Sequence, residues 1–169
     1  MLAFQIGNEV NPNELASTLA IDRNTVIEYM NILEKFHIIY LLPAFSKFPR
    51  KEIAKHKKVF FVDLGIRNIL INNFAPMGNR NDFGALFENF VVNHLRWTEF
   101  AKSEHSKFYF WRNYQNAEID LIIEKEGMLT PIEIKYSKMA SLPKSFLRSY
   151  EEEITSFYCI NRENFWKYL

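Results

Sequence analysis

The chain has 169 residues, a formal net charge of +1 and 48% hydrophobic residues. This length suits one domain or two small ones, and the apolar content predicts a packed core rather than disorder. A near-neutral total is far from the strongly basic character that identifies many nucleic-acid-binding proteins. The single cysteine, Cys159, excludes an internal disulfide and a cysteine-rich zinc site. With no signal peptide and no apolar run of about 18 residues, we expect a cytoplasmic protein without a membrane span.

Two helix starts and a pair of strands organise the first half of the chain. Asn11 caps a helix that has Pro12 at its first position, and Asp22 caps a second helix after a short link. A strand is predicted in "HIIYLLPAF", and a returning strand followed by a short helix in "KKVFFVDLGIRNIL". Helix, turn, helix and strand pair is the order of a winged helix.

A break in the pattern separates the two halves. Pro76 and Gly78 lie in the polar stretch "APMGNRND", so we predict domains at 1–78 and 79–169. Asp82 then caps a helix in "DFGALFENFVVNHLRW", which carries one apolar stripe. Strands are predicted in "KFYFWRN", "AEIDLIIE" and "LTPIEIKYS", then a helix near "PKSFLRSYEE", a strand in "TSFYCI" and a last helix in "NRENFWKYL". The predicted fold class is therefore α/β, with an αβββαβ second half.

Two of these strands carry an unusual set of charges. In "AEIDLIIE", alternation places Ile119, Leu121 and Ile123 on one face of the strand. The same alternation places Glu118 and Asp120 on the other face. The first of these strands is therefore predicted to have an apolar face and an acidic face.

The returning strand places two further charges, Glu133 and Lys135, on its polar face. Glu126–Gly127 between the strands can form a two-residue turn, with glycine where a positive φ is needed. This register sets Asp120 opposite Glu133, and Glu118 opposite Lys135. Two opposed carboxylates repel each other, so the arrangement needs a cation.

Two explanations of the paired carboxylates remain open from periodicity alone. In the first, Lys135 offsets Asp120 and Glu133 on a solvated face, in ion pairs that contribute about 0–1 kcal/mol. In the second, Asp120, Glu133 and the carbonyl oxygen of Ile134 hold Mg²⁺, which prefers oxygen ligands. The ion then activates water and neutralises charge on a phosphate, while Lys135 orients the water or stabilises the pentavalent phosphorus.

Asp120, a spacer of 12 residues and then Glu133-Ile134-Lys135 resemble the signature of the PD-(D/E)XK nucleases. The resemblance implies a restriction-endonuclease-like fold with a mixed sheet and a further carboxylate on its first helix. Glu88 in "LFENFV" stands at that position. By this resemblance Asp120, Glu133 and Glu88 bind the metal, beside the Ile134 carbonyl considered above, and Lys135 serves the attacking water. The family has Pro-Asp where this chain has Ile-Asp, a position that varies among its members.

Longer stretches resemble the C-terminal part of a family of prokaryotic AAA-type ATPases. They include "GALFENFVVNHL", "FYFWRNYQNAEIDLIIE" and "PIEIKYSK". In that family an ATPase domain precedes a winged-helix segment and a nuclease-like domain of unknown function. The chain has five glycines and no G-x-x-x-x-G-K-[ST] loop, so we expect no nucleotide site and infer a fragment without the ATPase domain.

The resemblances leave two functions open. The first is Mg²⁺-dependent cleavage of nucleic acid, whether DNA or RNA. The alternative is a non-catalytic module that binds DNA or docks a protein partner for the ATPase. The implied partners are therefore nucleic acid and the ATPase domain of a longer protein.

A basic patch in the predicted wing is the best candidate for contact with phosphates, although a solvated loop explains it equally well. Arg23 begins the second helix, but Glu28 and Glu34 on the same helix weaken its case. The patch itself, in "KFPRKEIAKHKK", consists of Lys47, Arg50, Lys51, Lys55, Lys57 and Lys58.

Overall fold

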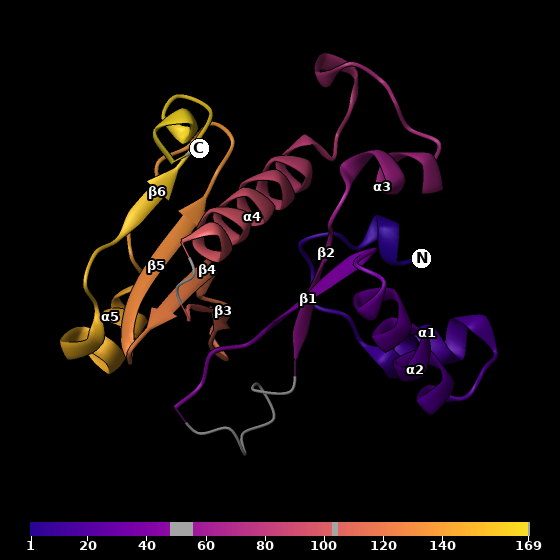
Figure 1. Cartoon of the computed structure of the whole chain (residues 1–169), viewed down its shortest axis with the longest axis horizontal. Helices are drawn as coiled ribbons and strands as arrows, with labels where there is room; N and C mark the ends of the chain where they lie inside the picture. Colours follow the sequence, from indigo (N-terminus) through magenta and orange to yellow (C-terminus); the bar gives the residue numbers. More distant parts are fainter. Residues whose placement is uncertain (48–55, 103–104, 169) are drawn as a thin grey trace.

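The computed structural model describes residues 1–47, 56–102 and 105–168, which form a mixed α/β fold with a two-stranded and a four-stranded sheet (Figure 1). The predicted contacts Arg50, Lys51 and Lys55 lie outside the described residues. The first half contains the 3₁₀ turn η1 (Leu2–Phe4), α1 (Pro12–Leu19), α2 (Arg23–Lys35), β1 (Ile39–Pro43), β2 (Lys57–Phe61) and α3 (Leu64–Leu70). The second contains η3 (Met77–Asn79), α4 (Phe83–Ala101), β3 (Lys107–Arg112), β4 (Glu118–Lys125), β5 (Met128–Ile134), α5 (Lys144–Tyr150), η4 (Glu151–Glu153), β6 (Tyr158–Ile160) and η5 (Phe165–Tyr168).

The predicted elements of the first half are confirmed in type and order. The Asn11 side chain accepts a hydrogen bond from the backbone N–H of Asn13 at the start of α1. Asp22 accepts one from the N–H of Asn24 at the start of α2. Because these caps satisfy N–H groups that a helix cannot pair internally, they explain where both helices begin. The chain then forms β1 and returns antiparallel as β2.

The second half follows the predicted order, with one helix shorter than expected. Its sheet has the order β3-β4-β5-β6, in which β3, β4 and β5 are antiparallel and β6 runs parallel to β5. The fold class, α/β with a mixed sheet, is therefore confirmed. The last helix, predicted in "NRENFWKYL", is wrong in length, because only the 3₁₀ turn η5 forms there.

Asp82 lies at the predicted start of α4 but does not cap it through its side chain. Its carboxylate instead binds the guanidinium groups of Arg67 and Arg80. Hydrogen bonds from Arg80 hold the pKa of Asp82 well below its usual range despite partial burial. The ion pairs therefore tie the start of α4 to α3, which carries Arg67.

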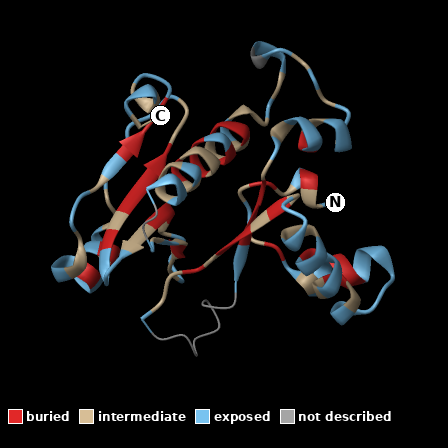
Figure 2. Cartoon of the chain, in the orientation of Figure 1, coloured by how far each residue is buried: buried red, intermediate tan, exposed pale blue. Residues whose placement is uncertain are grey.

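Helices cover both faces of the four-stranded sheet. Val91 of α4 packs with Leu121 and Ile132 under one face. Phe146 of α5 packs with Ile122 on the other face. Figure 2 shows the resulting buried stripe along α4 and the central strands. This sandwich of helix, sheet and helix is the usual way in which an α/β domain buries a sheet.

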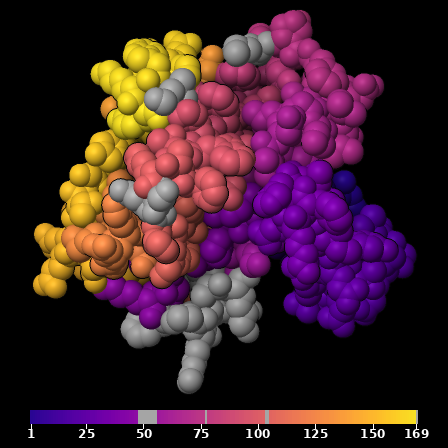
Figure 3. Space-filling model, viewed as in Figure 1, coloured from indigo at the N-terminus to yellow at the C-terminus, as the bar shows by residue number. Residues whose placement is uncertain are grey.

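The two halves share a hydrophobic core. Leu42 of β1 and Phe60 of β2 pack in the same cluster as Phe87 of α4. The backbone joins them as well, because the N–H of Phe45 donates to the carbonyl of Phe110 in β3. In the space-filling view the first half, coloured indigo to magenta, adjoins α4 directly (Figure 3). The domain division at 78/79 stays a prediction, but packing continues across it.

None of the helices in the described ranges is long and apolar enough to span a membrane.

The shared core predicts that a cavity in the first half destabilises the second. Phe60→Ala should lower the free energy of unfolding by about 3–5 kcal/mol, because Phe60 is fully buried. The tryptophans, Trp97, Trp111 and Trp166, all lie in the second half. The urea midpoint measured by their fluorescence should therefore fall by as much as the midpoint measured by circular dichroism. Phe36→Ala, at an exposed position, is the control; an unmoved fluorescence midpoint in Phe60→Ala would contradict the shared core.

Candidate functional site

A bulge in β4 sets the direction of the Asp120 side chain, the first carboxylate of the site. The β3–β4 register shifts by one residue between Tyr109 and Trp111. Asp120 and Leu121 therefore stand together opposite Phe110. A bulge of this kind bends the strand and redirects its side chains. Asp120 owes its direction to this irregularity and not to a regular pleat.

The bulge also overturns the predicted faces of β4. Leu121 and Ile123 belong to the cluster under α4, whereas Ile119 belongs to the cluster under α5. The expectation that all three share one face is therefore wrong for Ile119. The physical reason is that one extra residue in a strand reverses the alternation beyond it.

The predicted hairpin turn is confirmed. Glu126–Gly127 connects β4 to β5 with φ values of 52° and 82°, the left-handed conformation that this turn requires. The ladder follows the predicted register and ends at the pair Leu121 and Ile132. Beyond it, the N–H of Ile134 donates to Oδ2 of Asp120 at 2.8 Å. A side-chain carboxylate thus takes the place of the next backbone partner.

Three predicted residues meet at this end of the hairpin. The Nζ of Lys135 lies 2.8 Å from Oδ2 of Asp120 and 3.0 Å from Oε2 of Glu133. The side chains of Asp120 and Glu133 are 7% and 6% exposed, whereas the Lys135 side chain is 41% exposed. The solvated face of the simpler explanation is therefore wrong, because the acids are buried and only the ammonium reaches water.

Glu88 approaches the site from α4. Next to it, the fully buried Asn89 donates to the carbonyl of Phe61 and accepts from the N–H of the same residue, both at 2.8 Å. These bonds fix α4 against β2, so that Oε1 of Glu88 lies 3.5 Å from Nζ of Lys58. Glu88, the carboxylate predicted on the helix, thus reaches the site through a lysine.

Lys58 also belongs to the site, although the sequence predicted it as part of the basic surface patch. Its side chain is buried, and its ammonium binds Glu118 and lies 4.0 Å from Oδ1 of Asp120. The predicted pairing of Glu118 with Lys135 does not form, because the β4–β5 ladder ends at Leu121 and Ile132 and Glu118 binds Lys58 instead. A signal for the burial of Lys58 existed, because alternation in "KKVFF" places it on the same face of β2 as the core residue Phe60.

Burial and mutual repulsion shift the acids in this cluster. Burial, with further contributions from Asp120 and Glu118, raises the pKa of Glu88 to about 7 although Lys58 opposes the shift. Burial and the neighbouring Asp120 raise the pKa of Glu133 to about 7. Both acids therefore favour the protonated form more strongly than an exposed glutamate does.

The pKa values of the two lysines are raised as well, which for a lysine favours the charged form. Burial opposes the charge on Lys58, but Glu88, Glu118 and Asp120 outweigh it and raise the pKa of the ammonium. Burial also opposes the charge on Lys135, but Asp120 and Glu133 outweigh it and raise the pKa of this ammonium as well. Both side chains therefore act as fixed positive charges near neutral pH.

The N-terminal segment around Gly7 and Glu9 lies against the site beside Glu88. Gly7 has φ of +73°, and a Cβ at this position would lie 3.2 Å from Oε2 of Glu88. A side chain would thus be strained by its backbone and crowd the carboxylate. Nearby, Glu9 binds His56 and accepts a hydrogen bond from Arg112 at 3.0 Å. Sequence periodicity gave no signal for this segment, which lies far from the hairpin in the chain.

The predicted phosphate contacts do not all lie together. Arg23 and Lys57 are exposed and line one hollow of about 180 Å³ on the first half. Lys47 lies apart from them and pairs with Glu153. Lys58 is buried in the carboxylate cluster and does not face solvent. The described basic residues therefore divide between a surface and the site.

The donor set fits a hard divalent cation at one position. Asp120 and Glu133 supply carboxylate oxygens, as Mg²⁺ prefers. The Ile134 carbonyl points to the same side of β5 as its N–H, toward Asp120. Glu88 fits less well, because Lys58 stands between it and Asp120. Within the described part of the chain, no three His, Cys, Asp or Glu side chains already converge as an ion site.

Each half of the chain matches a family model that is described only as a domain of unknown function. Residues 83–165 match the family model described as "Domain of unknown function (DUF4143)". Residues 1–76 match a second one, described as "Domain of unknown function (DUF8612)". The DUF4143 match contains Glu88 and the three hairpin residues, whereas Lys58 belongs to the DUF8612 match. The charged cluster is thus built from both matched segments.

Two curated relatives are longer than this chain. The chain is 28% identical over 148 residues to Uncharacterized protein Rv2008c of Mycobacterium tuberculosis. It is equally similar to Uncharacterized protein Mb2031c of Mycobacterium bovis. Each alignment covers 86% of this chain and 32% of the relative, so the chain spans about a third of their length. No solved structure matches the chain.

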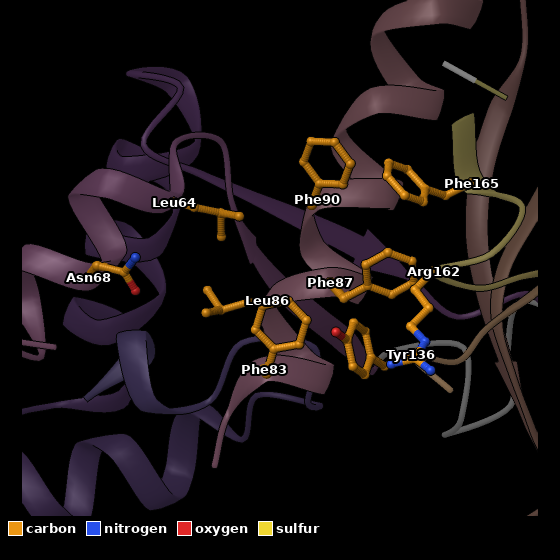
Figure 4. A pocket seen from close by; sticks show the side chains of 9 residues that line it. All are labelled: Leu64, Asn68, Phe83, Leu86, Phe87, Phe90, Tyr136, Arg162 and Phe165. Carbon is orange, nitrogen blue, oxygen red and sulfur yellow. The ribbon is translucent and has the colours of Figure 1, made fainter. Parts of the chain in front are cut away.

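A separate apolar pocket of about 450 Å³ lies at the start of the DUF4143 match (Figure 4). Figure 4 shows the aromatic side chains of α4, of Tyr136 and of the C-terminal segment around it, with the Asn68 amide, the Arg162 guanidinium and the Tyr136 hydroxyl as polar groups. None of the predicted site residues lines it. The lining residues are Leu64, Asn68, Phe83, Leu86, Phe87, Phe90, Tyr136, Arg162 and Phe165.

The raised pKa of Glu133 predicts how stability depends on pH. Below its ordinary pKa of 4.5 the residue is protonated in both states, and above about 7 the folded protein bears the full cost of ionising it. Its contribution therefore becomes less favourable as pH rises from 4.5 to 7. Glu133→Gln should be more stable than the parent at pH 8 by about 1–3 kcal/mol, with the difference shrinking toward pH 4.5.

Urea unfolding at several pH values measures this difference. Glu163→Gln, at an exposed position, should show no comparable gain. A Glu133→Gln variant that loses stability equally at both ends of the pH range would refute the assignment.

Proposed function

We propose that the chain is a Mg²⁺-dependent phosphodiesterase that cleaves nucleic acid, with a winged helix in its first half and a restriction-endonuclease-like fold of the PD-(D/E)XK type in its second. The observation that carries the proposal is the meeting of Asp120, Glu133 and Lys135 at the end of the β4–β5 hairpin. Burying two acids together is costly, and a site evolved only for stability would gain little from it. A cation-binding and catalytic role explains the cost.

Each residue has a distinct task in this proposal. Asp120, Glu133 and the Ile134 carbonyl would hold the ion, with Glu88 available as a further carboxylate. When bound, the ion would supply an activated water and neutralise charge on the phosphate. Lys135 contacts both acids and reaches solvent, so its ammonium would orient the water and stabilise the phosphorane oxygens. Because those acids keep it charged, it would act as a fixed cation and not as the base.

The first half would deliver the substrate. Arg23 and Lys57 around their shared hollow would bind phosphates, together with Lys47 and the predicted wing residues Arg50, Lys51 and Lys55. Lys58 is left out of this group because it is buried. The charges of the surface residues would hold the backbone of DNA or RNA without reading its sequence.

The chain would act as the C-terminal part of an AAA-type ATPase in the cytoplasm. The resemblance of its motifs to that family supports this, as does the fact that the chain spans about a third of the curated relatives. The ATPase domain would then be the main protein partner, and nucleotide would bind there and not on this chain.

Cleavage assays test the nuclease. We expect Mg²⁺- or Mn²⁺-dependent cleavage of supercoiled, linear or single-stranded DNA, or of RNA, by the parent protein. Asp120→Asn and Lys135→Ala should each lower the rate on the order of a hundredfold or more, since each removes charge at the reacting phosphate. Glu124→Gln is the matched control, because Glu124 lies on the same strand and pairs with Lys107. Equal cleavage by all four proteins would reveal a contaminating nuclease.

A non-catalytic docking module is the second candidate. Two observations favour it: Lys58 and Lys135 already neutralise much of the acidic cluster, and the apolar pocket of Figure 4 could accept apolar side chains of a partner protein. In this case the ion pairs of the acidic cluster would only hold the two halves together, and the partner would bind to the protein surface.

Binding measured by fluorescence anisotropy separates the two candidates. A docking module should bind labelled DNA equally well in EDTA and after Asp120→Asn, because neither change touches its surface. Arg23→Ala and Lys57→Ala should each weaken the binding and reduce its salt slope by about 1. Binding that requires Mg²⁺ and fails in Asp120→Asn would instead favour the nuclease.

A further inference from the structure

Lys58 stands where a second cation would lie. Its Nζ binds Glu118, is 3.5 Å from Oε1 of Glu88 and is 4.0 Å from Oδ1 of Asp120. A divalent ion bridging Glu88 and Asp120 would need the space that this ammonium fills. The lysine comes from β2, whereas the carboxylates come from α4 and β4.

The position of Lys58 is fixed by the fold. In β2 it pairs with Leu42, and it forms a bridge to Glu9 of the N-terminal segment. Its ammonium also lies over the ring of Phe110, 5.4 Å from the centroid. Only 4% of its side chain is exposed. The ammonium therefore cannot turn into solvent unless β2 separates from α4 and the second sheet.

We propose that Lys58 is a built-in cation that occupies the second cation position of the cluster and keeps Glu88 as its own counter-ion. The metal centre would then hold a single divalent ion, on Asp120 and Glu133. This inference rests on the proposed function, because it concerns the same centre. Lys58 is a positioning residue here: it acts through Glu88 and never contacts the substrate.

Metal binding measured without substrate tests the inference. Isothermal titration of the apo protein with Mn²⁺ should give one ion for the parent. Lys58→Met removes the competing charge and frees Glu88, so it should bind a second ion or bind the first about tenfold more tightly or better. Adding Glu88→Gln to Lys58→Met should abolish the gain. Lys57→Met, whose side chain is exposed one residue earlier, should match the parent.

The variant also removes a charge from a buried cluster and could unfold. Lys58→Met combined with Glu118→Gln removes one charge of each sign and leaves Glu88 and Asp120 in place, so it keeps the test valid. Circular dichroism verifies folding of every variant before titration.

The outcomes separate this inference from the proposed function. One ion in the parent, with unchanged stoichiometry and affinity in both Lys58 variants, would overturn the role of Lys58 and leave the nuclease proposal standing. Two ions in the parent would also overturn it. Binding only after Lys58 is replaced would support the role of Lys58 as the built-in cation but overturn the single-ion centre and, with it, the nuclease proposal. Absence of Mn²⁺ binding in every folded variant would overturn both proposals.

Discussion

The buried ammonium of Lys58 is the constraint on which the arrangement of this protein depends. Three carboxylates, Glu88, Glu118 and Asp120, lie around it in a setting from which most water is excluded. Acids brought together in this way would repel each other without a cation. Because the cation is carried by the first half and the acids by the second, the docking of β2 and the integrity of the cluster require each other. The shared apolar core makes the same connection without charge.

The cluster as a whole is left acidic. When all groups are ionised, its four carboxylates, with Glu133 as the fourth, exceed its two lysines by two charges. Burial, together with the neighbouring acids, raises the pKa values of Glu88 and Glu133, so that a proton is another cation that can reduce the excess. A divalent ion would balance the charge completely. This is the physical link between the unusual electrostatics of the folded chain and the proposed phosphodiester chemistry.

Chain irregularities, more than regular elements, shape the site. The β4 bulge turns Asp120 away from the position that simple alternation predicts. Gly7 brings the backbone of the N-terminal segment against Glu88 without a side chain between them. Asn89 supplies the hydrogen bonds that place α4 beside the edge of β2. Each is a local feature with a long-range effect, which explains why the acids converge although they are distant in the sequence.

The sequence by itself determined the local structure: the caps at Asn11 and Asp22, the Glu126–Gly127 turn and the register of β4 against β5 that this turn fixes. These depend on contacts between near neighbours in the chain, which periodicity and turn chemistry describe. Tertiary structure alone decided the phase of β4 after its bulge and the acidic partners of Lys58. Both follow from packing between segments far apart in the sequence. Lys58 reads as a member of a basic surface patch because its acidic partners come from α4 and β4, which only the folded chain brings to β2.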